Sequence, residues 1–129
     1  MTWSALFLAM LVSHAVGDFL FQTDWEARNK AGGLGGHEGG RALGRHVLTY
    51  TLAFVPEFVW IANNRGSLRG VEIAALVIFP HLLLDDGRFV RFWLERVKGV
   101  ERPGMGLSIA VDQSFHLVSL LGAALLAVA

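Results

Sequence analysis

The chain has 129 residues, enough for one domain, and its 11 lysines and arginines balance its 11 aspartates and glutamates. This balance points to no charged partner, and the absence of cysteine excludes disulfides, thiolate metal sites and cysteine nucleophiles. Hydrophobic residues make up 53% without counting the 15 glycines, above the roughly 45–50% that soluble domains reach with glycine included. The composition therefore favours a membrane protein.

The first apolar segment covers about residues 2–21 and is long enough to cross a bilayer as a helix, which needs about 20 mainly apolar residues. It carries His14 and Asp18, which are four residues apart and therefore share a helical face one turn apart. Gln22 continues that face. The stretch 30–44 is rich in glycine but matches no phosphate-binding or dinucleotide-binding fingerprint, so it predicts a flexible linker.

The second apolar segment, about residues 46–62, predicts a shorter spanning helix. His46 begins it, and Tyr50 follows one turn later. Glu57 lies further along the same face. We expect Glu57, together with Glu72, to sit at the outer interface of the membrane.

The third segment, about residues 70–86, reaches spanning length and ends with His81 and Asp85, again one turn apart. Residues 88–98 then place apolar side chains on one helical face and most charged side chains elsewhere. That pattern is typical of a short helix lying on the membrane surface.

The fourth segment, about residues 107–128, carries the pair in reverse order, as Asp112 and His116. Together the segments predict an all-α fold: an integral membrane bundle of four transmembrane helices with a short interfacial helix, in a single domain over residues 1–129. None of the segments shows an internal repeat.

Positive charge predicts the orientation of this bundle. If all four segments span, the loops 22–45 and 85–106 lie on one side and hold nine of the 11 lysines and arginines. Short loops rich in lysine and arginine stay in the cytoplasm. Both termini are therefore expected to be periplasmic, in a cytoplasmic membrane.

Three His–Asp pairs and His46 then converge at one depth, near the cytoplasmic leaflet. An aspartate at the centre of a membrane helix costs about 2.5–3.5 kcal/mol on insertion scales, so such residues usually mark function. A mutually satisfied hydrogen-bond network is the structural alternative. Nitrogen and oxygen ligands without sulfur suit zinc, manganese or iron, as one ion or as two. The predicted ligands are His14, Asp18, His81, Asp85, Asp112 and His116.

These residues suggest a metal-dependent hydrolase at the cytoplasmic face, acting on a phosphoester or lipid substrate. The candidate catalytic residues are His46, as a general base or a seventh ligand, and Asp86. Residues expected to orient the ligands through hydrogen bonds are Gln22, Tyr50 and Gln113. Candidates for holding an anionic headgroup are Arg28, Arg45 and Arg88. Membrane lipid is the expected partner, and nucleic acid is not, because the basic residues belong to membrane loops and no nucleic-acid-binding motif is present.

Two other functions use the same residues. The site could be a binding station in a metal-ion or proton transporter, or the His–Asp network could only lock a structural membrane protein. A polar path from the site to Glu57 would favour transport, and a blind cavity open to the cytoplasm would favour catalysis.

The stretches "HAVGDFLFQTDW", "RHVLTYT", "HLLLDDGR" and "DQSFH" resemble the recurring motifs of a bacterial membrane protein family, domain of unknown function 3307. The resemblance covers nearly the whole chain. It implies a small integral protein of the bacterial inner membrane and brings no established activity. A looser likeness is to membrane-bound metal-dependent hydrolases, and the H-x3-D pair is similar to ligand pairs of zinc-dependent phospholipase C.

Overall fold

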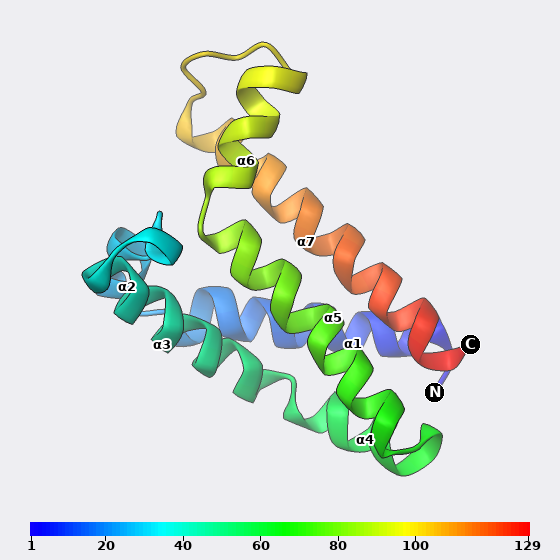
Figure 1. Ribbon diagram of the computed structural model, residues 1–129. Coiled ribbons are helices and arrows are strands. Elements are labelled where there is room, and N and C mark those ends of the chain that lie inside the picture. Colours follow the sequence, from blue (N-terminus) through cyan, green and yellow to red (C-terminus); the bar gives the residue numbers. More distant parts are fainter.

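The computed structural model describes residues 1–129, and it is helical without any strand. Figure 1 shows α5 and α7 side by side, with the two chain ends close together at one end of the molecule. The elements in chain order are α1 (Trp3–Ala15), the π-helix η1 (Val16–Phe21), α2 (Asp24–Asn29), the 3-10 turn η2 (Gly33–Gly35), α3 (His37–Ala53), α4 (Val55–Arg65), α5 (Ser67–Asp85), α6 (Arg88–Phe92), the π-helix η3 (Trp93–Val97) and α7 (Met105–Val128).

Three helical segments are long and apolar enough to cross a membrane: Trp3–Phe21, Ser67–Asp85 and Met105–Val128. The all-α prediction is therefore confirmed, together with three of the helices as candidate spans. The expected single helix over residues 46–62 is instead two helices, because α3 ends at Ala53 and α4 begins at Val55. Pro56 accounts for the break, since proline lacks a backbone N–H and its ring clashes with the carbonyl one turn earlier.

The glycine-rich stretch 30–44 is ordered and partly helical, so the prediction of a flexible linker there is wrong. η2 packs against the first turns of α3, where Gly33 meets Gly39. A Cβ atom on Gly33 would lie 2.6 Å from the carbonyl oxygen of Gly39. The glycines therefore permit a close backbone approach rather than a loose connection.

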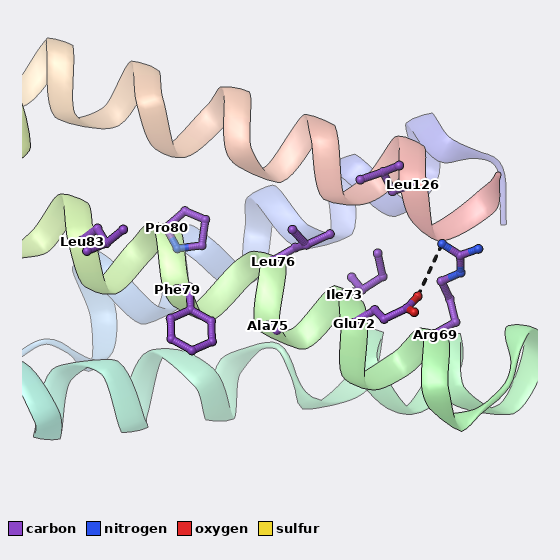
Figure 2. Close-up of a pocket in the computed structure, with 9 residues that line it drawn as sticks. All are labelled: Arg69, Glu72, Ile73, Ala75, Leu76, Phe79, Pro80, Leu83 and Leu126. Atoms are coloured by element: carbon purple, nitrogen blue, oxygen red, sulfur yellow. Dashed lines mark ion pairs between the residues drawn. The ribbon is translucent and has the colours of Figure 1, made fainter.

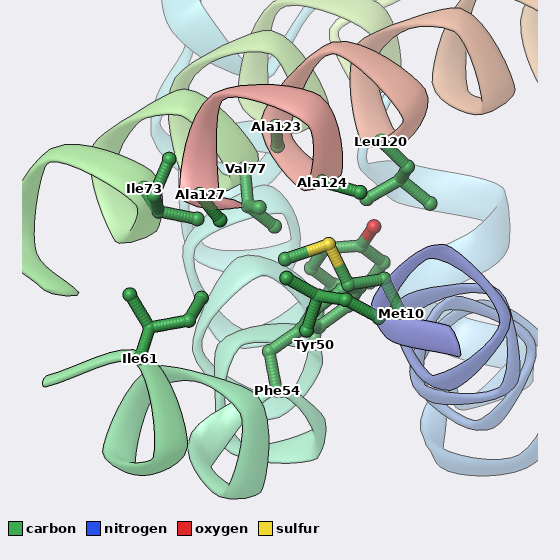
Figure 3. Packing of buried hydrophobic residues seen from close by; sticks show 11 residues of the cluster. Met10, Tyr50, Phe54, Ile61, Ile73, Val77, Leu120, Ala123, Ala124 and Ala127 are labelled. Carbon is green, nitrogen blue, oxygen red and sulfur yellow. The ribbon is translucent and has the colours of Figure 1, made fainter. Parts of the chain in front are cut away.

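The hydrophobic core joins α1, α3, α4, α5 and α7 at the end of the bundle nearest the chain termini. Met10, Tyr50, Phe54, Ile73 and Leu120 belong to this cluster and are almost completely buried (Figure 3). Three alanines of α7 also belong to the cluster, and their small side chains let α7 pack close to α5: Ala123, Ala124 and Ala127. The core thus fixes the helices on which the polar residues stand.

Pro80 lies inside α5 and leaves the carbonyl of Leu76 without its usual helical donor. The Ser119 hydroxyl of α7 donates to this carbonyl over 3.5 Å. A neighbouring helix thus satisfies the freed backbone group, as is usual for proline in membrane helices. The helix continues past Pro80 and carries His81 and Asp85 on its last turns.

Large apolar side chains cover the outside of the molecule, whereas several ionisable side chains are buried inside. Leu8, Val12, Phe79 and Val118 are each 60–68% exposed. The buried polar residues include four histidines and five acidic residues. This inverted distribution suits surroundings of lipid rather than water.

Candidate metal centre

The histidines and aspartates singled out from the sequence come from four parts of the chain that meet inside the bundle. Asp18 lies on η1, His46 on α3, His81 and Asp85 near the end of α5, and His116 on α7. All five are at least 94% buried. The π-helical turn of η1 sets the direction of Asp18, and π-helical turns are frequent at functional sites.

Four ligand atoms form a compact group: one each from Asp18, His46, His81 and Asp85. The Nε2 atom of His46 lies 2.7 Å from Oδ2 of Asp85, 3.2 Å from Oδ1 of Asp18 and 3.1 Å from Nε2 of His81. The Nε2 atom of His81 is 3.4 Å from Oδ2 of Asp85 and 3.7 Å from Oδ1 of Asp18. A tetrahedral ion with bonds of about 2.1 Å separates its ligands by about 3.4 Å, so the group has the size of a tetrahedral metal site.

The hydrogen bonds of the structure do not satisfy every atom of this group. Nε2 of His46 carries at most one hydrogen but lies within 3.2 Å of two carboxylate oxygens and of Nε2 of His81. Oδ1 of Asp18 is buried and has no hydrogen-bond partner. A divalent cation at the centre would satisfy all four atoms and offset the repulsion of the two carboxylates.

A second group shares Asp85 with the first and adds Asp112 and His116. The Nε2 atom of His116 is 3.4 Å from Oδ1 of Asp85, whereas the first group uses Oδ2 of the same carboxylate. The Nδ1 atom of His116 is 3.6 Å from Oδ2 of Asp112. Asp85 therefore belongs to both groups, and Asp112 is the only partly exposed member.

His14 lies beside these groups but belongs to neither. Its Nδ1 is hydrogen-bonded to the Tyr50 hydroxyl at 3.0 Å and its Nε2 to Oε1 of Gln113 at 2.9 Å. The Tyr50 ring in turn stacks on the His81 ring, with centroids 3.4 Å apart and planes 6° from parallel. His14, expected as a ligand, is thus held as an orienting residue, whereas His46, expected as a general base or a seventh ligand, belongs to the first group.

The family described as "Protein of unknown function (DUF3307)" matches residues 6–129. The chain belongs to this family. The matched region includes every histidine and aspartate of both groups, and the resemblance seen in the sequence motifs is confirmed. No curated protein and no solved structure matches the chain.

Of the residues expected to orient ligands, Gln113 has the clearest role in the geometry. Its amide nitrogen donates to Oδ2 of Asp112 at 3.2 Å and to Oδ2 of Asp18 at 3.4 Å. Gln22 instead accepts from the ammonium group of Lys30, which also contacts Oδ2 of Asp85. Gln22 thus reaches the groups only through Lys30.

Asp86 was expected at the site as a catalytic residue, but it faces the 30–36 segment. Its Oδ1 accepts from the backbone N–H of Leu34 at 2.9 Å, and its carbonyl accepts from Gly32 at 2.8 Å. Its Oδ2 is 2.7 Å from Nε of Arg88. Asp86 therefore ties the segment before α3 to the end of α5.

The three arginines expected to hold substrate lie in ion pairs away from both groups. Arg88 pairs with Asp86 as described. Arg28 pairs with Asp24 at 3.1 Å on the surface, and Arg45 lies 3.5 Å from Glu26. The structure therefore does not bring these arginines to the histidines and aspartates.

Sequence reasoning missed Lys30, because its contact joins the end of α2 to Asp85 on α5, 55 residues later, and no local pattern signals it. It also expected Glu57 at the outer interface and did not anticipate that its side chain is buried inside the bundle. Glu57 is 6% exposed, and its Oε1 accepts from the Ser13 hydroxyl at 2.8 Å. Glu72 is exposed and pairs with Arg69, as Figure 2 shows.

The cavity drawn in Figure 2 has a volume of about 520 Å³ and lies along the outer side of α5. Apart from Arg69 and Glu72 its lining is apolar or small, and none of the histidines or aspartates of the two groups contributes to it. It offers no chemistry of its own.

Proposed function

We propose that this DUF3307 member is a metal-dependent hydrolase whose site lies at the cytoplasmic side of the bacterial inner membrane. The observation that carries the proposal is the four-atom group of Asp18, His46, His81 and Asp85. Its separations of 2.7–3.7 Å suit a tetrahedral ion, and its buried Asp18 Oδ1 has no hydrogen-bond partner. The adjoining group with Asp112 supports a second ion.

The topology proposed with it has four membrane passes and both termini in the periplasm. The α3–α4 pair would supply the pass that neither helix is long enough to make alone. The loop before α3 and the segment before α7 lie at the same end, because Gly32 and Leu34 bond to Asp86. The chain termini lie together at the other end in Figure 1. This arrangement agrees with the excess of lysine and arginine in the two loops.

Divalent ions in these groups would lower the pKa of a coordinated water and stabilise negative charge on the reacting group. In hydrolysis of a phosphate ester the water oxygen bonds to phosphorus, the bond to the ester oxygen breaks, and the departing alcohol takes a proton. Asp85 and Asp18 supply the negative charge that balances the ions. His14, Tyr50 and Gln113 hold the surrounding rings and carboxylates in place through the hydrogen bonds described.

The test measures metal content and hydrolysis in the same preparations, purified in detergent without chelators. We expect about one or two ions per chain, and release of nitrophenol from a nitrophenyl phosphate ester. Asp85→Asn should lose both the metal and the activity, because an amide supplies no charge to balance the ions. Asp24→Asn removes an exposed carboxylate and should change neither. A metal-free wild-type protein, or an Asp85→Asn variant with full metal and activity, would overturn the proposal.

Transport has less support. No hydrogen bond joins the Ser13–Glu57 pair to the histidines, and Oε2 of Glu57 has no partner at all. A cavity that reaches Asp85 and Asp112 is lined by the exposed Arg91, so the groups are accessible from one end of the bundle. Ion uptake into vesicles containing the protein, absent from vesicles with Glu57→Gln, would instead favour transport.

A further inference from the structure

A cavity of about 310 Å³ lies beside the second ligand group, between the ends of α5 and α6 and the start of α7. Two of its lining residues, Asp85 and Asp112, belong to that group. A volume near 300 Å³ is at the lower end for sites that hold small molecules. Any molecule in this cavity would therefore contact the ligand residues directly.

Two basic side chains line the same cavity. Arg91 stands on α6, and no ion pair or hydrogen bond in the structure involves its guanidinium group. Lys30 reaches in from the loop after α2, where its ammonium group contacts Asp85 and Gln22. Lys30 thus places its ammonium group at Oδ2 of Asp85, the oxygen that we propose as a ligand of the first ion. An ion bound there would displace the ammonium group of Lys30 into the cavity.

Apart from Ser108, the remaining lining of the cavity is apolar or small, and it includes Leu84, Val90, Leu94 and Ile109. Val90 and Leu94 pack with Leu84 in a small hydrophobic cluster. The cavity therefore combines charged and apolar side chains, which suits a molecule with an anionic group and a hydrocarbon part.

We infer that this cavity binds the phosphoryl group of a phosphate monoester, with Arg91 and Lys30 as its cationic contacts. The inference rests on the proposed function, because the ester must lie against the ions held by Asp85 and Asp112. A guanidinium group donates two parallel hydrogen bonds to phosphate oxygens, which makes an unpaired arginine the better anchor. A dianionic phosphoryl group balances the two side-chain charges.

The monoester can come from a lipid headgroup or from a molecule in water, because the cavity lies where α5 ends and α7 begins. The phosphoryl chemistry is the same in both cases, and the apolar wall accepts the start of a lipid chain as well as a small alkyl group. The two sources differ only in whether a membrane lipid competes for the site.

The experiment titrates inorganic phosphate into the metal-loaded protein by calorimetry, with metal content measured on the same samples. Arg91→Gln should weaken phosphate binding by about 10-fold or more, the usual cost of losing a charge-assisted contact. Arg96→Gln is the matched control, because Arg96 is exposed on the next turn, has no partner and does not line the cavity. It should bind phosphate as the wild type does. Lys30→Met should weaken binding as well.

The same titration in nanodiscs of phosphatidylcholine, with and without phosphatidic acid, distinguishes a lipid headgroup from a soluble phosphate ester as the bound molecule. Weaker phosphate binding in the presence of phosphatidic acid, lost in Arg91→Gln, supports a lipid headgroup. Unchanged binding in both nanodiscs supports a soluble ester. Equal phosphate affinity in Arg91→Gln and Arg96→Gln, or no phosphate binding by metal-loaded wild type, would overturn this inference alone. A wild-type protein that binds no metal would refute the proposed function, and the inference would fail with it.

Discussion

Replacement of Gly17 by alanine tests the helix packing that positions the site. A Cβ atom there would lie 2.6 Å from Cδ2 and 3.1 Å from Cα of Tyr50. The Tyr50 ring cannot move aside easily, because its hydroxyl bonds to His14 and its face stacks on His81. The backbones of η1 and α3 must therefore separate by several tenths of an ångström. Overpacking of this kind costs about 1–3 kcal/mol.

Alanine also gains about 1 kcal/mol of helix propensity over glycine, so the comparison needs a matched control. Gly122 lies within α7, and a Cβ atom there would meet nothing within 4 Å. We expect Gly17→Ala to be about 1–3 kcal/mol less stable than Gly122→Ala. Unfolding in mixed micelles with increasing dodecyl sulfate, followed by circular dichroism, measures the difference. Equal stability of the two variants would refute the close contact between η1 and α3.

Three further predictions concern polar contacts and topology. Tyr50→Phe should cost about 1 kcal/mol in the same unfolding titration and leave the metal content unchanged; no loss of stability would contradict the bond to His14. Ser13→Ala should cost about 1–3 kcal/mol because it leaves Glu57 buried without a donor, and Glu57→Leu in the same chain should recover most of it. A double variant no more stable than Ser13→Ala would contradict that reasoning. Single cysteines at Gly36 and Glu101 should react with an impermeant reagent only from the cytoplasmic side; periplasmic labelling of either would overturn the topology.

The sequence predicted the His–Asp convergence because helical spacing is a local property. His81 and Asp85 share a face on any α-helix. Three such pairs in apolar segments at the same membrane depth indicate one shared site rather than three independent ones. Which side chains meet in each of the two groups was harder to predict, because that depends on how each helix is rotated about its own axis. The π-helical turn of η1 changes that rotation after His14, so Asp18 enters the first group while His14 turns toward Tyr50.

The ion pairs of the arginines could not be predicted from spacing. The partners of Arg45 and Arg88 depend on where Glu26 on α2 and Asp86 after α5 lie, and long side chains reach whichever acidic group the fold supplies. Lys30 illustrates the same limit, since its contact with Asp85 follows from the path of the glycine-rich stretch. That stretch looked flexible because glycine composition alone does not distinguish a linker from close backbone packing.

The proposed function requires a metal ion held between Asp18, His46, His81 and Asp85. Anomalous diffraction from crystals of the metal-loaded protein, recorded on both sides of the absorption edge of the metal, tests it most directly. The account predicts a peak about 2.0–2.2 Å from Nε2 of both histidines and from Oδ1 of Asp18. A metal-loaded crystal with its peak elsewhere, and with these side chains joined only by hydrogen bonds, would contradict the account.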